Sequence, residues 1–196
     1  CADTPSFGHR QGYLHAAPLG IDSDYGNTFS GGIGTGTILA DVETGWTWDH
    51  EDTVHKALGN VIGLTPAIYP EDHGTAVLGE LVGENNGIGV KGIVYDADVR
   101  MSSHRGNQDN MATAIAYAPD AVGPGDFIIL EIQCLGGPLG PYPCESIDSI
   151  FAVVSKYSKL IPVDCAAWRI APVIGAALAV AGLTAIGWRL IASRFG

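Results

Sequence analysis

The sequence predicts an α/β fold built on a doubly wound parallel sheet. Two short apolar runs, 37–43 and 126–132, have the length of buried strands, and glycines bound the first of them. Residues 110–118 and 146–160 instead carry apolar side chains at helical spacing. Strands that alternate with helices in this way are typical of a parallel sheet with crossover helices.

Four further segments complete the predicted order of elements. A short strand is expected at 60–64, and a helix is expected at 76–82, where the residues are apolar apart from one glutamate. Strands are also expected at 94–101 and 161–167. The chain then divides into an irregular N-terminal arm, a core, and an apolar C-terminal helix. These parts are 1–30, 31–168 and 169–196.

Composition limits the classes of function that the chain can serve. The chain has 196 residues, 46% hydrophobic and 16% charged, which is enough apolar material for one domain with a core. Its net charge is −11 and its pI is about 4.7. Nucleic-acid binding needs clustered Lys and Arg, so we exclude nucleic acid as a partner.

A histidine at the start of a predicted helix is the first candidate catalytic residue. His73 precedes the apolar run 76–82, and Gly74 beside it lacks a Cβ, which allows another segment or a substrate to come close. Histidine titrates near neutral pH and can act as a general base. The competing interpretation is a histidine that only caps the helix.

The residues around His73 resemble a known family. The order His-Gly-Thr at 73–75, followed by Asn-Asn-x-x-Gly-Val-x-Gly-Ile at 85–93, resembles the histidine motif of the subtilisin-like serine proteases, the subtilases of peptidase family S8. The resemblance covers roughly residues 11–165. It implies a subtilisin-like fold, a secreted or extracellular protein, and a protein or peptide substrate.

The same resemblance implies an Asp-His-Ser triad for peptide-bond hydrolysis. Asp41 lies at the carboxyl end of the strand at 37–43, where open α/β sheets place their sites, and is taken as the triad aspartate with His73 as the base. Glu43 is its rival, because it lies on the same face of that strand.

The family pattern breaks after residue 165. Trp168 stands where the family has its oxyanion asparagine, and Ser193 lacks the Gly-Thr-Ser setting of the nucleophile. The C-terminal part of the family core is therefore expected to be missing, and we expect the chain to be an inactive serine endopeptidase as it stands. The alternative is a non-catalytic relative that binds peptides or partners.

No cofactor is required by this chemistry, but the resemblance implies a structural calcium site. Asp52 and Asn86 would supply side-chain oxygens, and the backbone carbonyls of Glu84, Ile88 and Val90 would complete an oxygen-rich shell.

Four cysteines are present, with spacing unlike that of a zinc site. Cys134 and Cys144 flank a loop rich in Gly and Pro. They form a disulfide in an oxidising compartment, or they are two buried free thiols, and the sequence favours neither.

The C-terminal run 170–188 is apolar and has the length of a membrane helix. It predicts a membrane anchor, and a buried core helix is an equal alternative. A change of coding frame near residue 165 is a third explanation, since it would account for the lost asparagine, the lost serine and the new composition together.

Overall fold

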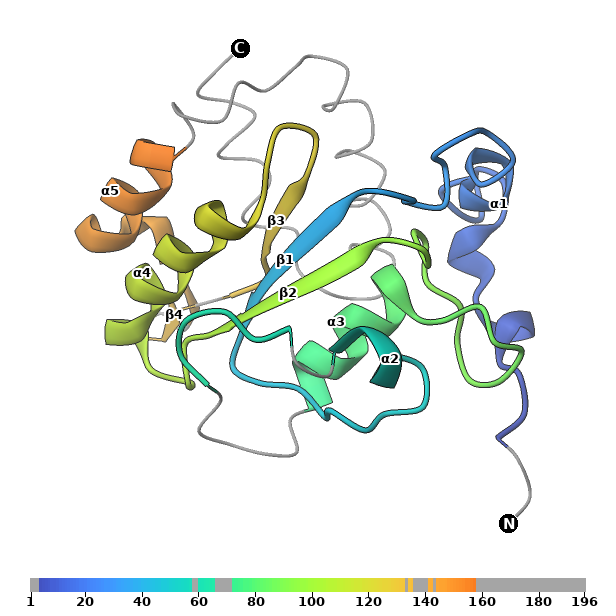
Figure 1. Ribbon diagram of the computed structural model, residues 1–196, viewed down its shortest axis with the longest axis horizontal. Helices are drawn as coiled ribbons and strands as arrows, with labels where there is room; N and C mark the ends of the chain where they lie inside the picture. Colours follow the sequence, from blue (N-terminus) through green and yellow to red (C-terminus); the bar gives the residue numbers. More distant parts are fainter. Residues whose placement is uncertain are drawn as a thin grey trace.

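A small parallel sheet forms the centre of the computed structural model, which describes residues 4–57, 60–65, 72–132, 134–135, 141–142 and 144–157. Its strands are β1 (Ile38–Glu43), β2 (Asp98–Ser103) and β3 (Phe127–Leu130), in the order β2–β1–β3 (Figure 1). In the register of the sheet, Asp41 on β1 lies opposite Met101 on β2 and Ile129 on β3.

The remaining elements are short helices and one small hairpin. The α-helices are α1 (Ser23–Gly26), α2 (Val54–Ala57), α3 (Asp72–Val82), α4 (Gln108–Tyr117) and α5 (Asp148–Tyr157). The 3-10 helices are η1 (Gly8–Arg10), η2 (Gly12–Leu14), η3 (Ala118–Ala121) and η4 (Cys144–Ser146). Strands β4 (Cys134–Leu135) and β5 (Pro141–Tyr142) pair antiparallel.

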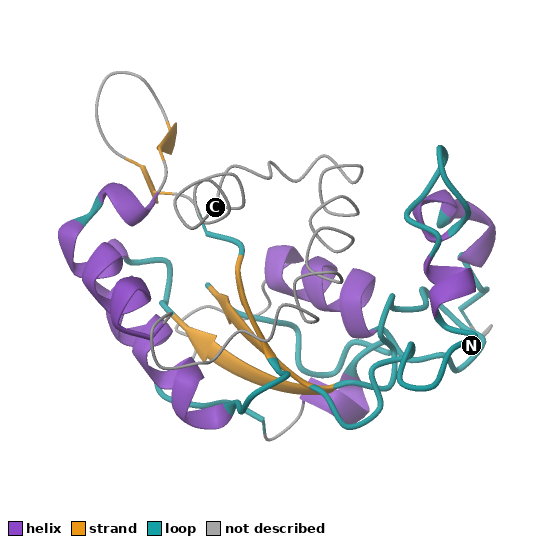
Figure 2. Cartoon of the chain, turned by 90° about the horizontal axis from the view of Figure 1, so that it is seen from above, coloured by secondary structure: helices purple, strands orange, loops and turns teal. Residues whose placement is uncertain are grey.

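Helices cover both faces of the sheet (Figure 2). Successive side chains of a strand point to opposite faces, so β1 serves two cores. Leu39 packs in one core with apolar side chains of α3, among them Val77 and Leu81. Ala40 and Val42 pack in the other core with α4 and α5. Asp41 and Glu43 therefore share the face of Leu39, which is the face that α3 covers.

The sheet and its helices confirm a mixed α/β fold with parallel strands. Two boundaries differ from the prediction. Residues 94–97 form a turn closed by Ala97 N–H donating to Val94 O at 2.9 Å, so β2 begins only at Asp98. The strand expected at 60–64 is reduced to one parallel bridge between Val61 and Met101. Three strands do not establish the larger doubly wound sheet that was predicted.

Two predicted segments, the strand at 161–167 and the apolar run at 170–188, lie outside the described residues. Among the helices that the structure describes, none is long and apolar enough to cross a membrane.

The N-terminal arm packs against the core, unlike a simple surface arm. Leu14 is buried in the same core as the apolar side chains of α3. Gln11 is also buried, where its Nε2 donates to Lys91 O at 2.8 Å and its Oε1 accepts from Lys91 N–H at 3.0 Å. Phe7 N–H donates to Gly89 O at 2.7 Å. These bonds attach the arm to the loop that follows α3.

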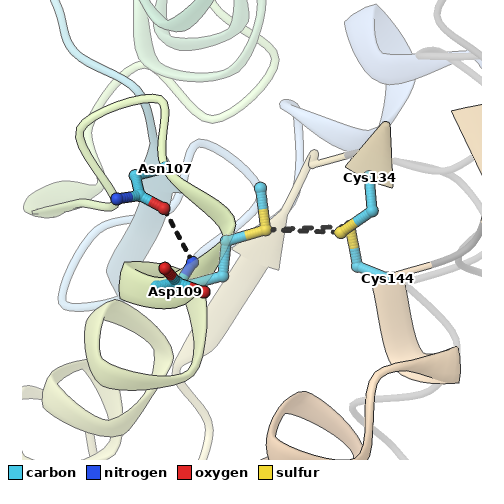
Figure 3. Close-up of a disulfide and its surroundings, with 5 residues drawn as sticks. Asn107, Asp109, Cys134 and Cys144 are labelled. Carbon is cyan, nitrogen blue, oxygen red and sulfur yellow. Dashed lines mark hydrogen bonds between the residues drawn. A yellow bond between two sulfur atoms is a disulfide. The ribbon is translucent and has the colours of Figure 1, made fainter. Parts of the chain in front are cut away.

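A disulfide joins Cys134 and Cys144, so the structure decides between the two alternatives for these cysteines. Both are buried, and their sulfur atoms lie 3.5 and 3.8 Å from Met111 Sδ on α4 (Figure 3). The same helix begins at a capping residue, Asn107, whose side chain accepts from Asp109 N–H at 2.9 Å. The hairpin is thereby tied to the start of α4.

Candidate active site

A histidine and a glutamate meet where β1 ends and α3 begins. His73 is the second residue of α3, and its Nδ1 lies 2.8 Å from Glu43 Oε1. The Glu43 side chain is only 3% exposed, whereas that of His73 is 45% exposed. A buried carboxylate thus holds one ring nitrogen, and Nε2 is the nitrogen left to act on a bound molecule.

The position of Glu43 is fixed from several directions. It is the last residue of β1, and its Oε2 accepts from Thr44 N–H at 3.1 Å. Its backbone carbonyl accepts from His104 N–H at 2.9 Å, just after β2. Because both carboxylate oxygens and the main chain are hydrogen-bonded, Glu43 holds its negative charge at a fixed position beside the imidazole.

The first turn of α3 lies in close contact with the loop after β1. A Cβ on Gly74 would lie 2.4 Å from Gly45 O and 2.9 Å from Trp46 Nε1, so only glycine fits this position. Thr47 N–H donates to Thr75 Oγ1 at 2.8 Å and joins the same two segments. This contact places His73 over the end of β1.

Asp41 is not the carboxylate that binds His73, and the sequence-based assignment is corrected here. Its side chain is fully buried, and its Oδ2 accepts from Trp46 Nε1 at 2.8 Å. Glu43 lies one pleat closer to the strand end and has one more methylene, so it reaches the start of α3 where Asp41 does not. Glu43, the rival considered from the sequence, holds the imidazole.

The ion pair changes the charge state of the imidazole. The hydrogen bond to Glu43 raises the pKa of His73 to about 9, with further support from the charges of Glu43 and Glu131, although burial acts in the opposite direction. His73 is therefore an imidazolium at neutral pH. It can donate a proton there, and it becomes a base only as the pH approaches 9.

A third carboxylate, Glu131, faces the same site. It directly follows β3, beside β1, and burial raises its pKa to about 6, while the charge of His73 lowers the pKa. One of its carboxylate oxygens is buried without a hydrogen-bond partner. Glu131 was not among the site residues predicted from the sequence, although it lies at the end of the clearest predicted strand, where the rule that selected Asp41 applies equally.

Asp52 and Asn86, the residues expected to bind calcium, both hold the loop after α3. Asp52 Oδ1 accepts from Val90 N–H at 3.2 Å. Asn86 Oδ1 accepts from Ile88 N–H at 3.1 Å, and its Nδ2 donates to Glu51 O at 3.3 Å. In the described parts of the chain, no three His, Cys, Asp or Glu side chains could hold a metal ion together. The calcium site stays a prediction from the sequence.

Comparison with known proteins gives little to set beside this geometry. No family model matches the chain, and no curated protein matches it. Among solved structures, the chain is similar to an "S41 Psychrophilic Protease", with 18% sequence identity and a TM-score of 0.47. The match covers 81% of this chain and 51% of that protein, so the chain spans about half its length.

These comparisons overturn the assignment to the subtilases. Neither a family model nor a curated protein supports that family, and the neighbour's printed name does not mention it. The predicted function, a subtilisin-like serine endopeptidase, is wrong with it. Part of the motif consists of glycines that packing itself demands: a Cβ on Gly74 or on Gly92 would lie 2.4 Å from a backbone atom. Such glycines reflect local geometry and are weak markers of a family.

Proposed function

We propose that this chain is a hydrolase of the peptidase class in which His73, held by Glu43, transfers the proton. The observation that carries the proposal is the 2.8 Å contact between a buried carboxylate and a half-exposed imidazole. This pairing fixes the tautomer of the ring and stabilises its protonated form. These are the two roles of the carboxylate beside a catalytic histidine.

Amide bonds are the substrate class that suits this charge state. An amine leaves an amide only after it gains a proton, and the imidazolium of His73 can donate one from Nε2 at neutral pH. The same ring must first accept a proton from the attacking water, whose hydroxyl adds to the amide carbonyl, and the neutral form of the ring increases as the pH rises toward 9. We therefore expect hydrolysis to increase between pH 7 and pH 9.

The experiment compares peptide hydrolysis by the unmodified chain, His73→Ala and Glu43→Gln with a mixture of quenched fluorescent peptides from pH 6 to pH 10. Removal of the proton-transfer group should lower the rate by about 10²–10⁴-fold. His55→Ala is the matched control, since His55 Nδ1 also lies 2.8 Å from a carboxylate, Glu84 Oε2, but away from the end of β1. We expect this control to keep the full rate.

Hydrolysis that is equally fast in His73→Ala would refute the proposal. If the unmodified chain itself cleaves no peptide across this range, the non-catalytic alternative, a module that binds peptides, becomes the better explanation.

A further inference from the structure

Two buried carboxylates on one face of β1 have very different partners. Glu43 contacts the imidazole of His73 and accepts from Thr44 N–H. Asp41 accepts only from the neutral indole N–H of Trp46 among the described residues, and its Oδ1 is buried without a hydrogen-bond partner. Asp41 is 0% exposed, so water does not solvate its charge either.

Physical chemistry gives the two groups different charge states. A buried carboxylate without a cation is costly to ionise, and two neighbouring buried carboxylates do not both ionise readily. Burial raises the pKa of Asp41 well above its ordinary value, and the charges of Glu43 and Glu131 raise it further. The Trp46 hydrogen bond and the His73 charge act against these effects without cancelling them.

We propose that Asp41 is a positioning residue for the Glu43–His73 pair. Asp41 stays protonated at neutral pH, so the negative charge resides on Glu43. Its catalytic consequence rests on the function proposed above, but the protonation state does not. The carboxyl acts through Trp46: the indole nitrogen that it fixes lies 2.9 Å from the place of a Gly74 Cβ, directly against the first turn of α3.

Neutral Asp41 thus sets the site in two ways. It fixes the Trp46 ring, against which the first turn of α3 packs. The position of that ring sets the distance between His73 and β1. It also adds no further charge directly beside Glu43, so Glu43 and not Asp41 is the anion that the imidazolium binds.

Infrared difference spectroscopy tests the protonation state directly. At pH 7, the spectrum of the unmodified chain minus that of Asp41→Asn should contain the C=O stretch of a protonated carboxyl group. The control is Asp98→Asn, which removes an exposed carboxylate at the start of β2 and should cost only carboxylate bands. If Asp41→Asn also removes only carboxylate bands, the inference is overturned.

The pH dependence of unfolding gives a second readout with a definite sign. A pKa raised in the folded state gives stability that is present below the unfolded pKa, about 4 for aspartate, and lost as the pH rises. The folding constant of the unmodified chain, divided by that of Asp41→Asn, should fall by up to about tenfold per pH unit above pH 4. A ratio that rises with pH contradicts the inference.

A second variant keeps the test decisive if Asp41→Asn does not fold. Trp46→Phe preserves the aromatic packing and removes the N–H donor to Asp41 Oδ2. The carboxyl C=O band should then move to higher frequency, because the carbonyl loses its hydrogen bond. Absence of any such band in both proteins overturns the inference. Neither readout measures hydrolysis, so failure here is distinguishable from failure of the proposed function.

Discussion

At the scale of single residues, the site is a balance of charges around one imidazolium. Glu43 bonds to His73 and raises the pKa of its ring to about 9, while Glu131 faces both groups from the end of β3. The stability that His73 gains from its partner is present below about pH 6.5, its unfolded pKa, and is lost as the pH rises through about 9. The pair should therefore stabilise the fold most at neutral pH and below.

Glu131→Gln should stabilise the protein at pH 8 and leave it nearly unchanged at pH 4.5. Burial raises the pKa of Glu131 to about 6, so its contribution to stability is present below its unfolded pKa and is lost as the pH rises through about 6. Allowing for partial exposure, we expect a gain of about 1 kcal/mol at pH 8. Urea unfolding at both pH values measures it. A loss of stability at pH 8 would mean that the ionised form of Glu131 is favoured by the site.

The sequence could predict which face of β1 carries the site, but not which carboxylate binds the imidazole of His73. The period of two places Asp41 and Glu43 on one face with Leu39. The choice between them depends on where the first turn of α3 lies, and this follows from the contact between Gly74 and Gly45, two segments far apart in the chain. A pattern read along one strand contains no such distance.

At the scale of elements, α3 is held against the loop after β1 by a contact that admits no side chain. Apolar side chains of α3 face the core, including Val77 and Leu81, while Gly74 lets the helix start meet the main chain at Gly45. The apolar spacing predicted this helix from the sequence with His73 at its start, and in the structure the helix begins one residue earlier, at Asp72. The early start places His73 within the helix.

Gly74→Ala should destabilise the protein by about 1–3 kcal/mol, the range for overpacking, because its Cβ would lie 2.4 Å from a backbone oxygen that cannot swing aside. It should also move His73 away from Glu43 and so reduce hydrolysis. Urea unfolding and the peptide assay measure the two effects.

Gly79→Ala in the same helix is the control for this substitution. Its Cβ would lie 3.4 Å from Val90 Cγ2, an ordinary contact, and alanine favours helix over glycine by up to about 1 kcal/mol. Equal losses in the two variants would show that α3 does not tolerate any added methyl group, and would remove the special role of Gly74.

At the scale of the whole molecule, the N-terminal arm completes the structure around the loop after α3. Gln11 bonds to both backbone groups of Lys91, and Leu14 enters the core with α3. The sequence predicted an irregular arm for residues 1–30 but not its attachment, because irregular segments have no periodicity from which a buried side can be deduced. Strands and helices were predictable because their apolar residues recur with a regular period.

Gln11→Ala should release the arm, because it leaves the N–H and C=O of Lys91 without their partners. Lys91 is only partly buried, so the expected cost is about 1 kcal/mol, the low end of the range for unsatisfied polar groups. Hydrogen exchange of the arm should accelerate, and proteases should cut within it sooner. His9→Ala, an exposed neighbour in the same arm, should leave both unchanged. An arm equally protected in both variants would show that its other contacts, Leu14 in the core and Phe7 N–H on Gly89 O, are enough to attach it.

The most direct test of the account is an NMR titration of His73 in the unmodified chain and in Glu43→Gln, with Glu84→Gln as a control that acts on the His55 pair. We predict a His73 pKa of about 9 in the unmodified chain, and a fall to about 6.5 or below in Glu43→Gln, because the hydrogen bond and the charge are lost while burial persists. Glu84→Gln should leave the His73 pKa unchanged. A His73 pKa near 6.5 in the unmodified chain, or one that Glu43→Gln does not lower, would contradict the claim that Glu43 holds this histidine as an imidazolium.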